Sequence, residues 1–282
     1  MEVGTATGAF HDGDDNRHDE PIRVAAVGDI HAGADEESVE RLRAGWAHLP
    51  DHADVLLLAG DLTRAGEPQE ARVVADAVRR TNVPTAAVLG NHDLHVGQAS
   101  EVVRILGSAG VTVLEGQAAV FDVAGARVGV AGTKGFGGGF EGASVSDFGE
   151  EQTKVFARHA METAASMRRA LSELDGVDLR IALLHYAPVR ATLRGETPEL
   201  YPFLGSYLLA ESVDAVGADL VLHGHAHHGS ERGVTTGGVR VRNVAQPVIR
   251  RAYRVFDLSH RRGRAPDWRV LSGRGRLDPR SR

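Results

Sequence analysis

One unit recurs five times along this 282-residue chain: a short aliphatic run followed closely by carboxylate, amide or imidazole side chains. The runs cover residues 22–27, 55–59, 85–89, 181–184 and 219–222. The motifs that follow them are Asp29-Ile30-His31, Gly60-Asp61, Gly90-Asn91-His92-Asp93, His185 and Gly224-His225-Ala226-His227. An apolar run that ends in a polar loop indicates a buried strand whose carboxyl end lies at the edge of a sheet. Because ligand sites in open α/β sheets collect at that edge, the five motifs are predicted to meet in one pocket.

The segments between these runs predict a layered α/β fold. Helices are expected over residues 36–48, 69–81 and 99–109, which gives strand–helix units and a parallel sheet with right-handed crossovers. Further strands are expected over 112–114, 118–123, 127–131, 239–244 and 252–258, with a tight hairpin at Ala124-Gly125 and a long helix over 150–174. We therefore expect a β-sandwich of two mixed sheets packed face to face, flanked by helices on both outer faces.

The polar motifs supply donors for divalent metal ions. The candidate ligands are Asp29, His31, Asp61, Asn91, His185, His225 and His227. Nitrogen and oxygen donors without thiolate suit Mn, Fe, Zn, Ni or Mg. Seven donors exceed the need of one tetrahedral site but fit two ions if one carboxylate bridges them.

The order of the motifs resembles that of the calcineurin-like metallophosphoesterase superfamily, whose pattern is D-x-H, G-D, G-N-H-[DE], H, G-H-x-H. The resemblance runs from Asp29 to His227 and implies a dinuclear centre of Mn²⁺, Fe²⁺/Fe³⁺, Zn²⁺ or Mg²⁺. The first ion would be held by Asp29, His31, Asp61 and His227, and the second by Asn91, His185, His225 and again Asp61. A hydroxide that bridges the ions would attack phosphorus, and His92 would protonate the leaving group or steady its charge. The lineup is most similar to bacterial phosphodiesterases and cyclic-nucleotide phosphodiesterases.

One position departs from the pattern of several relatives. Three residues after the Gly-Asp aspartate they carry a carboxylate that orients the catalytic histidine, whereas this chain has Arg64. What orients His92 is left open, with Asp93 a candidate by adjacency alone. Arg64 is expected to face the substrate phosphate, where a guanidinium fork binds well.

Two loops are further candidates for substrate contact. The glycine-rich segment 132–149 is expected to pass over the metal site, with Phe136 and Phe140 packing or stacking on substrate. It lacks the Lys-Ser/Thr of a P-loop. The long segment 186–205 is typical of a lid, in which Arg190 and Arg194 either meet a second phosphate or the leaving group or are ordinary surface arginines.

Composition bounds the remaining possibilities. The chain has no cysteine and a formal net charge of −6, which offers no global attraction for nucleic acid or membranes. No apolar stretch approaches membrane-spanning length, and the start lacks a signal-peptide pattern, so a cytoplasmic protein is expected. Residues 1–20 are predicted to be an acidic disordered segment, 21–260 the metallophosphoesterase domain and 261–282 an Arg-rich tail.

The expected partner is a small phosphate-ester substrate, with no nucleic acid beyond nucleotide substrates; the oligomeric state stays open. Two alternatives to a phosphodiesterase or phosphomonoesterase remain. One is a catalytically idle scaffold of the same fold, which the presence of His92 and all seven donors disfavours. The other is a nuclease, which the acidic total disfavours. Absence of an Asp-Arg-Gly element after Gly60-Asp61 disfavours a protein serine/threonine phosphatase.

Overall fold

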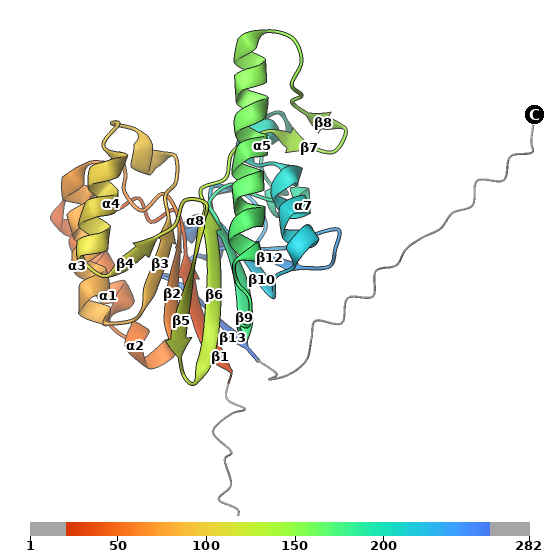
Figure 1. Ribbon diagram of the computed structural model, residues 1–282. Helices are drawn as coiled ribbons and strands as arrows, with labels where there is room; N and C mark the ends of the chain where they lie inside the picture. Colours follow the sequence, from red (N-terminus) through yellow and green to blue (C-terminus); the bar gives the residue numbers. More distant parts are fainter. Residues whose placement is uncertain (1–20, 260–282) are drawn as a thin grey trace, which may run out of the picture.

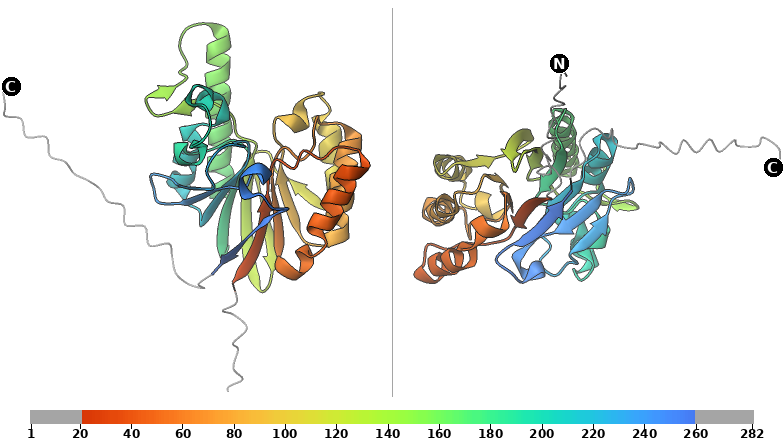
Figure 2. Two further views of the ribbon diagram at one scale, coloured as in Figure 1. Left: turned by 180° about the vertical axis from the view of Figure 1, so that it is seen from behind. Right: turned by 90° about the horizontal axis from the view of Figure 1, so that it is seen from below.

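The computed structural model describes residues 21–259 and shows four layers: helices, a five-stranded sheet, a six-stranded sheet and helices again (Figures 1 and 2). The predicted fold of two mixed sheets flanked by helices is thus confirmed. The predicted disordered head and the Arg-rich tail lie outside the described residues. In the described part of the chain, no helix is both long and apolar enough to cross a membrane.

The first sheet has the strand order β13-β1-β2-β3-β4. Its strands are β1 (Ile22–Val27), β2 (Val55–Ala59), β3 (Thr85–Val88), β4 (Val111–Val113) and β13 (Arg254–Leu258). Strands β1 to β4 are parallel, as the strand–helix alternation predicts, and β13 runs antiparallel to β1. The carboxyl ends of β1, β2 and β3 therefore lie at one edge.

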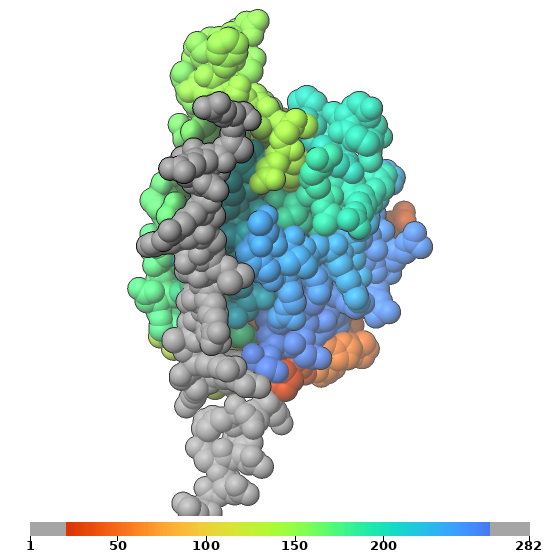
Figure 3. Space-filling view, turned by 90° about the vertical axis from the view of Figure 1, so that its right-hand side faces the viewer, coloured from red at the N-terminus to blue at the C-terminus, as the bar shows by residue number. Residues whose placement is uncertain are grey.

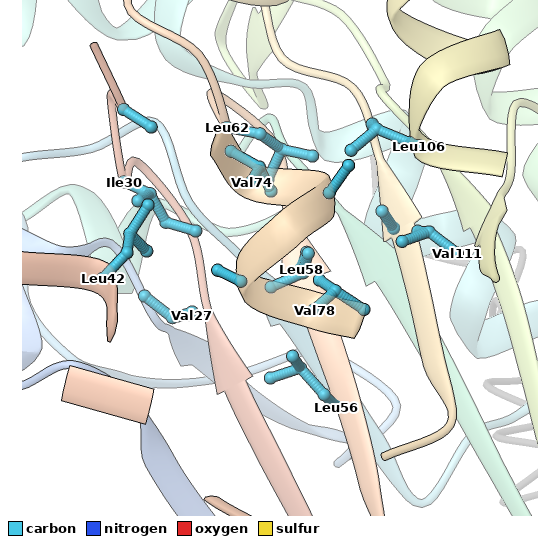
Figure 4. Close-up of a cluster of buried hydrophobic side chains, with 14 of the residues drawn as sticks. Val27, Ile30, Leu42, Leu56, Leu58, Leu62, Val74, Val78, Leu106 and Val111 are labelled. Carbon is cyan, nitrogen blue, oxygen red and sulfur yellow. The ribbon is translucent and has the colours of Figure 1, made fainter. Parts of the chain in front are cut away.

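Helices α1 (Glu36–Trp46), α3 (Pro68–Thr81) and α4 (Ala99–Ser108) cover the outer face of this sheet (Figure 1). Alternation along β2 sends Leu56 and Leu58 towards these helices, where they lie near Val74 and Val78 of α3 (Figure 4). Helix α3 begins at a proline, and Glu67 and Glu70 form a capping box around its first turn.

The second sheet has the strand order β11-β12-β10-β9-β6-β5. Its strands are β5 (Gln117–Val123), β6 (Ala126–Thr133), β9 (Leu179–Leu184), β10 (Leu220–His223), β11 (Arg232–Val234) and β12 (Arg240–Asn243). β9 is parallel to both β6 and β10. The predicted hairpin joins β5 and β6, with Ala124 and Gly125 both at positive φ.

A continuous apolar layer joins the two sheets. Val24 of β1 and Leu57 of β2 lie in one buried cluster with Val130 of β6, Ile181 of β9 and Leu222 of β10. Helices α5 (Glu151–Ser172) and α7 (Tyr207–Val216) cover the opposite face of the second sheet (Figures 1 and 2). The N-terminal part of α5 rises beyond the sheets (Figures 1 and 3).

Several short elements were not predicted. The helix expected over 36–48 ends at Trp46 and is followed by a separate turn of helix, α2 (Leu49–His52). The glycine-rich segment contains a small hairpin, β7 (Gly139–Phe140) and β8 (Ala143–Ser144). Segment 186–205 folds into short helices rather than an extended loop: η3 (Arg190–Leu193), η4 (Pro198–Leu200) and α6 (Tyr201–Leu204). Two further short helices are η2 (His92–Leu94) and α8 (Gln246–Ile249).

Of the two roles expected for Phe140, packing or stacking on substrate, the structure shows packing, because the side chain is buried. Phe140 packs in a cluster with Ala187, Leu193 and Ala226. The backbone of its loop pairs with Ser206, which follows α6. Phe136 packs too, with its ring centroid 5.8 Å from that of Tyr186.

Candidate metal centre

The loops after β1, β2 and β10 bring four donors together as a first ligand group. The group consists of Asp29, His31, Asp61 and His227. His227 Nε2 lies 2.8 Å from Asp29 Oδ1 and 3.5 Å from His31 Nε2. His31 Nε2 is 4.0 Å from Asp61 Oδ2. All four ligand atoms lie within 4.8 Å of one another, so one ion can be reached by all of them.

A second ligand group lies on the other side of Asp61. It consists of Asp61, His185 after β9 and His225 after β10. His185 Nε2 is 3.4 Å from Asp61 Oδ1 and 3.0 Å from Asn91 Oδ1, which follows β3. Two carboxylate oxygens of Asp61 thus face two different groups: Oδ2 the first and Oδ1 the second. Each sheet contributes donors to the second group.

Backbone strain is concentrated at these donors. Asp29, His31, Asp61 and His225 all have positive φ, between 45° and 68°, a region that L-residues rarely adopt. Hydrogen bonds hold this conformation: the Asp29 N–H donates to Gly60 O and the His31 N–H to Asp61 O. Strain of this kind persists where surrounding structure imposes it, typically at ligand sites.

Two glycines of the motifs permit the close approach. A Cβ atom on Gly90 would overlap Asp61 Oδ1, and one on Gly224 would overlap Asp29 Oδ2. The glycines therefore make room for the two carboxylates rather than for a turn.

Burial keeps most of the imidazoles neutral. It lowers the pKa of His31 to about 4 and the pKa values of His185 and His225 to about 3. A neutral ring keeps a lone pair for a metal ion. Burial also raises the pKa of Asp29 to about 6, and the hydrogen bond to the Asp29 carboxylate raises the pKa of His227. A divalent cation would take the place of the hydrogen that joins His227 Nε2 to Asp29 Oδ1, so the residues fit a metal site.

His92 is oriented by a backbone group. Its Nδ1 lies 2.8 Å from the carbonyl oxygen of Arg64, and its ring centroid is 4.5 Å from that of His31. Asp93, the adjacent candidate, is buried and instead accepts hydrogen bonds from the Thr63 and Gly90 backbone. Asp93 therefore fixes the loop and does not hold the His92 ring.

The three predicted substrate-binding arginines lie in different places. Arg64 lines a cleft together with Asp29 and His31, and its guanidinium is 2.9 Å from Asp35. Arg190 lines a different cleft, which contains no candidate ligand. Arg194 is exposed, and its carbonyl accepts a hydrogen bond from Ser230 Oγ. The structure brings only Arg64 to the ligand groups.

Lys134 was missed by the sequence analysis. It directly follows β6, and its carbonyl accepts the N–H groups of His185 and Tyr186. Its Nζ lies 5.2 Å from the ring centroids of Phe136 and Tyr186. Burial lowers the pKa of Lys134, while the charges of Glu115 and Asp61 oppose that shift. The sequence signal that could have found Lys134 was its position directly after a strand. It was passed over because lysine is not a metal ligand of this kind and because the pairing of β6 with β9 is not visible in the sequence.

Comparisons with known proteins point to one family. The family model for calcineurin-like phosphoesterases matches residues 22–229. Among solved structures, phosphopantetheinyl hydrolase PptH from Mycobacterium tuberculosis is similar with a TM-score of 0.60 at 16% identity, covering 84% of this chain and 96% of that chain. TT1561 of Thermus thermophilus gives a TM-score of 0.53 at 19% identity, and the match covers 84% of this chain and 99% of TT1561. GAP50, the anchor in the inner membrane complex of Plasmodium, gives 0.50 at 13% identity, covering 81% and 72%.

A search of curated proteins found no match. At these identities the structural similarities support the fold alone. The family match also supports membership of the family, because it spans most of the chain. The chain belongs to the calcineurin-like phosphoesterase family and is a metal-dependent phosphoesterase.

Proposed function

We propose that the protein hydrolyses small phosphate mono- or diesters at a dinuclear metal centre. The observation that carries this proposal is the position of Asp61, whose two oxygens face two separate groups of donors. Two bound divalent ions would supply an activated water and neutralise charge on the phosphate.

The ligand histidines are oriented by backbone carbonyls. His185 Nδ1 lies 2.9 Å from Ala59 O, and His225 Nε2 lies 3.2 Å from Phe203 O. In each case the nitrogen near the carbonyl donates, and the other ring nitrogen keeps its lone pair for a metal ion. Such outer hydrogen bonds fix the tautomer and the direction of a ligand ring.

His92 would act as the proton donor to the leaving oxygen. Because its Nδ1–H donates to Arg64 O, a protonated ring has its Nε2–H available for the substrate. Its own backbone N–H donates to Asp61 Oδ1 at 2.8 Å, which ties the position of the donor to the shared carboxylate.

Two positively charged side chains would bind the phosphate oxygens. Arg64 lines a cleft together with Asp29 and His31 of the first group, and Lys134 lies beside the second group. Neither is a metal donor, and both add positive charge where negative charge develops on the phosphate.

The complete donor set argues against an idle scaffold. All seven candidate ligands and His92 are present, and six of the seven ligands belong to the two converging groups, with Asn91 in contact with His185. A scaffold would have no need of four ligands in strained backbone conformations.

The test is hydrolysis of p-nitrophenyl phosphate and bis(p-nitrophenyl) phosphate after removal of metal with EDTA. We expect no turnover in EDTA and recovery on addition of Mn²⁺. His227→Ala should lose at least about a hundredfold in kcat/KM through loss of a ligand. The matched control is His48→Ala, because the His48 side chain is exposed and lies beside Asp51 and His52, away from the ligand groups. Failure of every divalent ion to restore hydrolysis, or full activity in EDTA, would contradict the proposal.

A further inference from the structure

Three arginines from separate parts of the chain line the cleft beside the first ligand group. Arg41 comes from α1, Arg64 from the loop after β2 and Arg250 from the end of α8. The cleft has a volume of about 510 Å³, and Asp29 and His31 form its wall on the side of the metal centre. Positive charge is thus placed next to the proposed reaction site.

This charge is not neutralised within the described part of the protein. Arg64 pairs with Asp35 at 2.9 Å, but both side chains are exposed, so the pair is weak. Neither Arg41 nor Arg250 makes an ion pair or a side-chain hydrogen bond to residues 21–259, and both are exposed. The net charge of the chain is −6, so the protein as a whole is not basic.

The position of Arg250 is fixed relative to the metal centre. The N–H of Gln246, the first residue of α8, donates to Gly28 O, one residue before Asp29. Arg250 ends α8 in a left-handed conformation with φ of 51°. The side chain of Arg250 lines the cleft in this conformation, which costs free energy for a residue other than glycine.

The cleft extends away from the ligands. A second hollow of about 350 Å³ shares Arg41, Gln246 and Arg250 with the first and is also lined by Arg251. A molecule with its reacting phosphate at the metal centre therefore has room for a further anionic group among these arginines.

We infer that this cleft binds a second phosphate of the substrate, so that the preferred substrates are small organic bisphosphates. The inference rests on the proposed phosphoesterase function and narrows its substrate class. Arginine suits this task because its planar fork donates two parallel hydrogen bonds to phosphate oxygens. The second phosphate binds to Arg41 and Arg250, while the reacting phosphate lies at the metal centre.

The experiment compares adenosine 3′,5′-bisphosphate with adenosine 5′-monophosphate on the Mn²⁺-loaded protein. Calorimetry gives Kd, and phosphate release gives KM and kcat. We expect the wild type to favour the bisphosphate by about tenfold or more in both Kd and KM. The double variant R41Q/R250Q should reduce this preference to less than about threefold and change kcat less than KM.

The matched control is R79Q/R104Q, which removes the same charge from exposed helical arginines that line neither hollow. It should keep the preference of the wild type. Equal binding of the two nucleotides by the wild type, or an unchanged preference in R41Q/R250Q, would overturn the inference. A third outcome would also overturn the inference: a short single-stranded DNA binds more tightly than the bisphosphate, and R41Q/R250Q abolishes that binding. The cleft would then be a site for nucleic acid.

The two proposals fail separately. A protein that hydrolyses neither nucleotide nor p-nitrophenyl phosphate, yet binds the bisphosphate preferentially through Arg41 and Arg250, would refute the proposed function and support the cleft. Hydrolysis of p-nitrophenyl phosphate without any bisphosphate preference would support the proposed function and refute the role of the cleft.

Discussion

At the scale of single residues, the candidate ligands could be predicted but the groups that orient them could not. Asp29, His185 and His225 belong to ordered motifs of chemically distinctive side chains. The partners of His92 and His185 are the carbonyl oxygens of Arg64 and Ala59. Every residue carries a carbonyl, so the sequence holds no signal for which one is used.

The role of His92 yields the first prediction at this scale. His92→Ala should keep the fold and both metal ions, because His92 is not placed among the ligands. Hydrolysis of adenosine 5′-monophosphate should fall by about 10²–10⁴-fold, since an alkoxide leaving group needs a proton. Hydrolysis of p-nitrophenyl phosphate should fall much less, because p-nitrophenolate leaves without one. Comparing kcat/KM for the two esters checks this, and equal losses would assign His92 an electrostatic or structural role.

At the scale of elements, strand positions were predictable because the aliphatic runs and the turn signals between them are clear. The order of strands across the second sheet was not, because β6 and β9 are separated by α5 and pair through long-range contacts. Lys134 was missed for that reason. Strand β11 was missed since only Gly233 of its three residues is buried, which leaves no apolar pattern.

The junction of β10 with η3 gives a prediction about pH. His223 is fully buried at the end of β10, where Nε2 lies 2.9 Å from Thr192 Oγ1, and burial lowers the pKa of His223 from 6.5 to about 4. The unfolded chain therefore binds a proton at His223 between pH 6.5 and 4 that the folded chain does not bind. The contribution of the neutral His223 side chain to the free energy of unfolding is therefore fully present above pH 6.5. It is lost as the pH falls towards 4.

Replacing His223 by glutamine keeps a hydrogen-bonding group without a titrating proton. Relative to wild type, the unfolding free energy of H223Q should therefore rise by about 1–2 kcal/mol between pH 7 and pH 5. Urea denaturation of both metal-free proteins at the two pH values measures this difference. A difference that is independent of pH would show that His223 does not titrate in this range.

At the scale of the whole molecule, the candidate metal centre lies where the two sheets meet. Loops after β1, β2 and β3 supply Asp29, Asp61 and Asn91 from the first sheet, and those after β9 and β10 supply His185 and His227 from the second. The layered fold was predictable from strand–helix alternation. The arginine cleft was not, because its residues are far apart in the sequence and follow no motif.

The proposed dinuclear centre depends most directly on Asp61 serving two ions. The decisive measurement is metal analysis of the protein after saturation with Mn²⁺ and removal of excess ion, for wild type and Asp61→Asn side by side. We expect two divalent ions per chain in the wild type. We expect at most one in the variant, because a carboxamide cannot offer two anionic oxygens to two cations. One ion in the wild type, or two ions retained with normal turnover in Asp61→Asn, would contradict the proposed dinuclear centre.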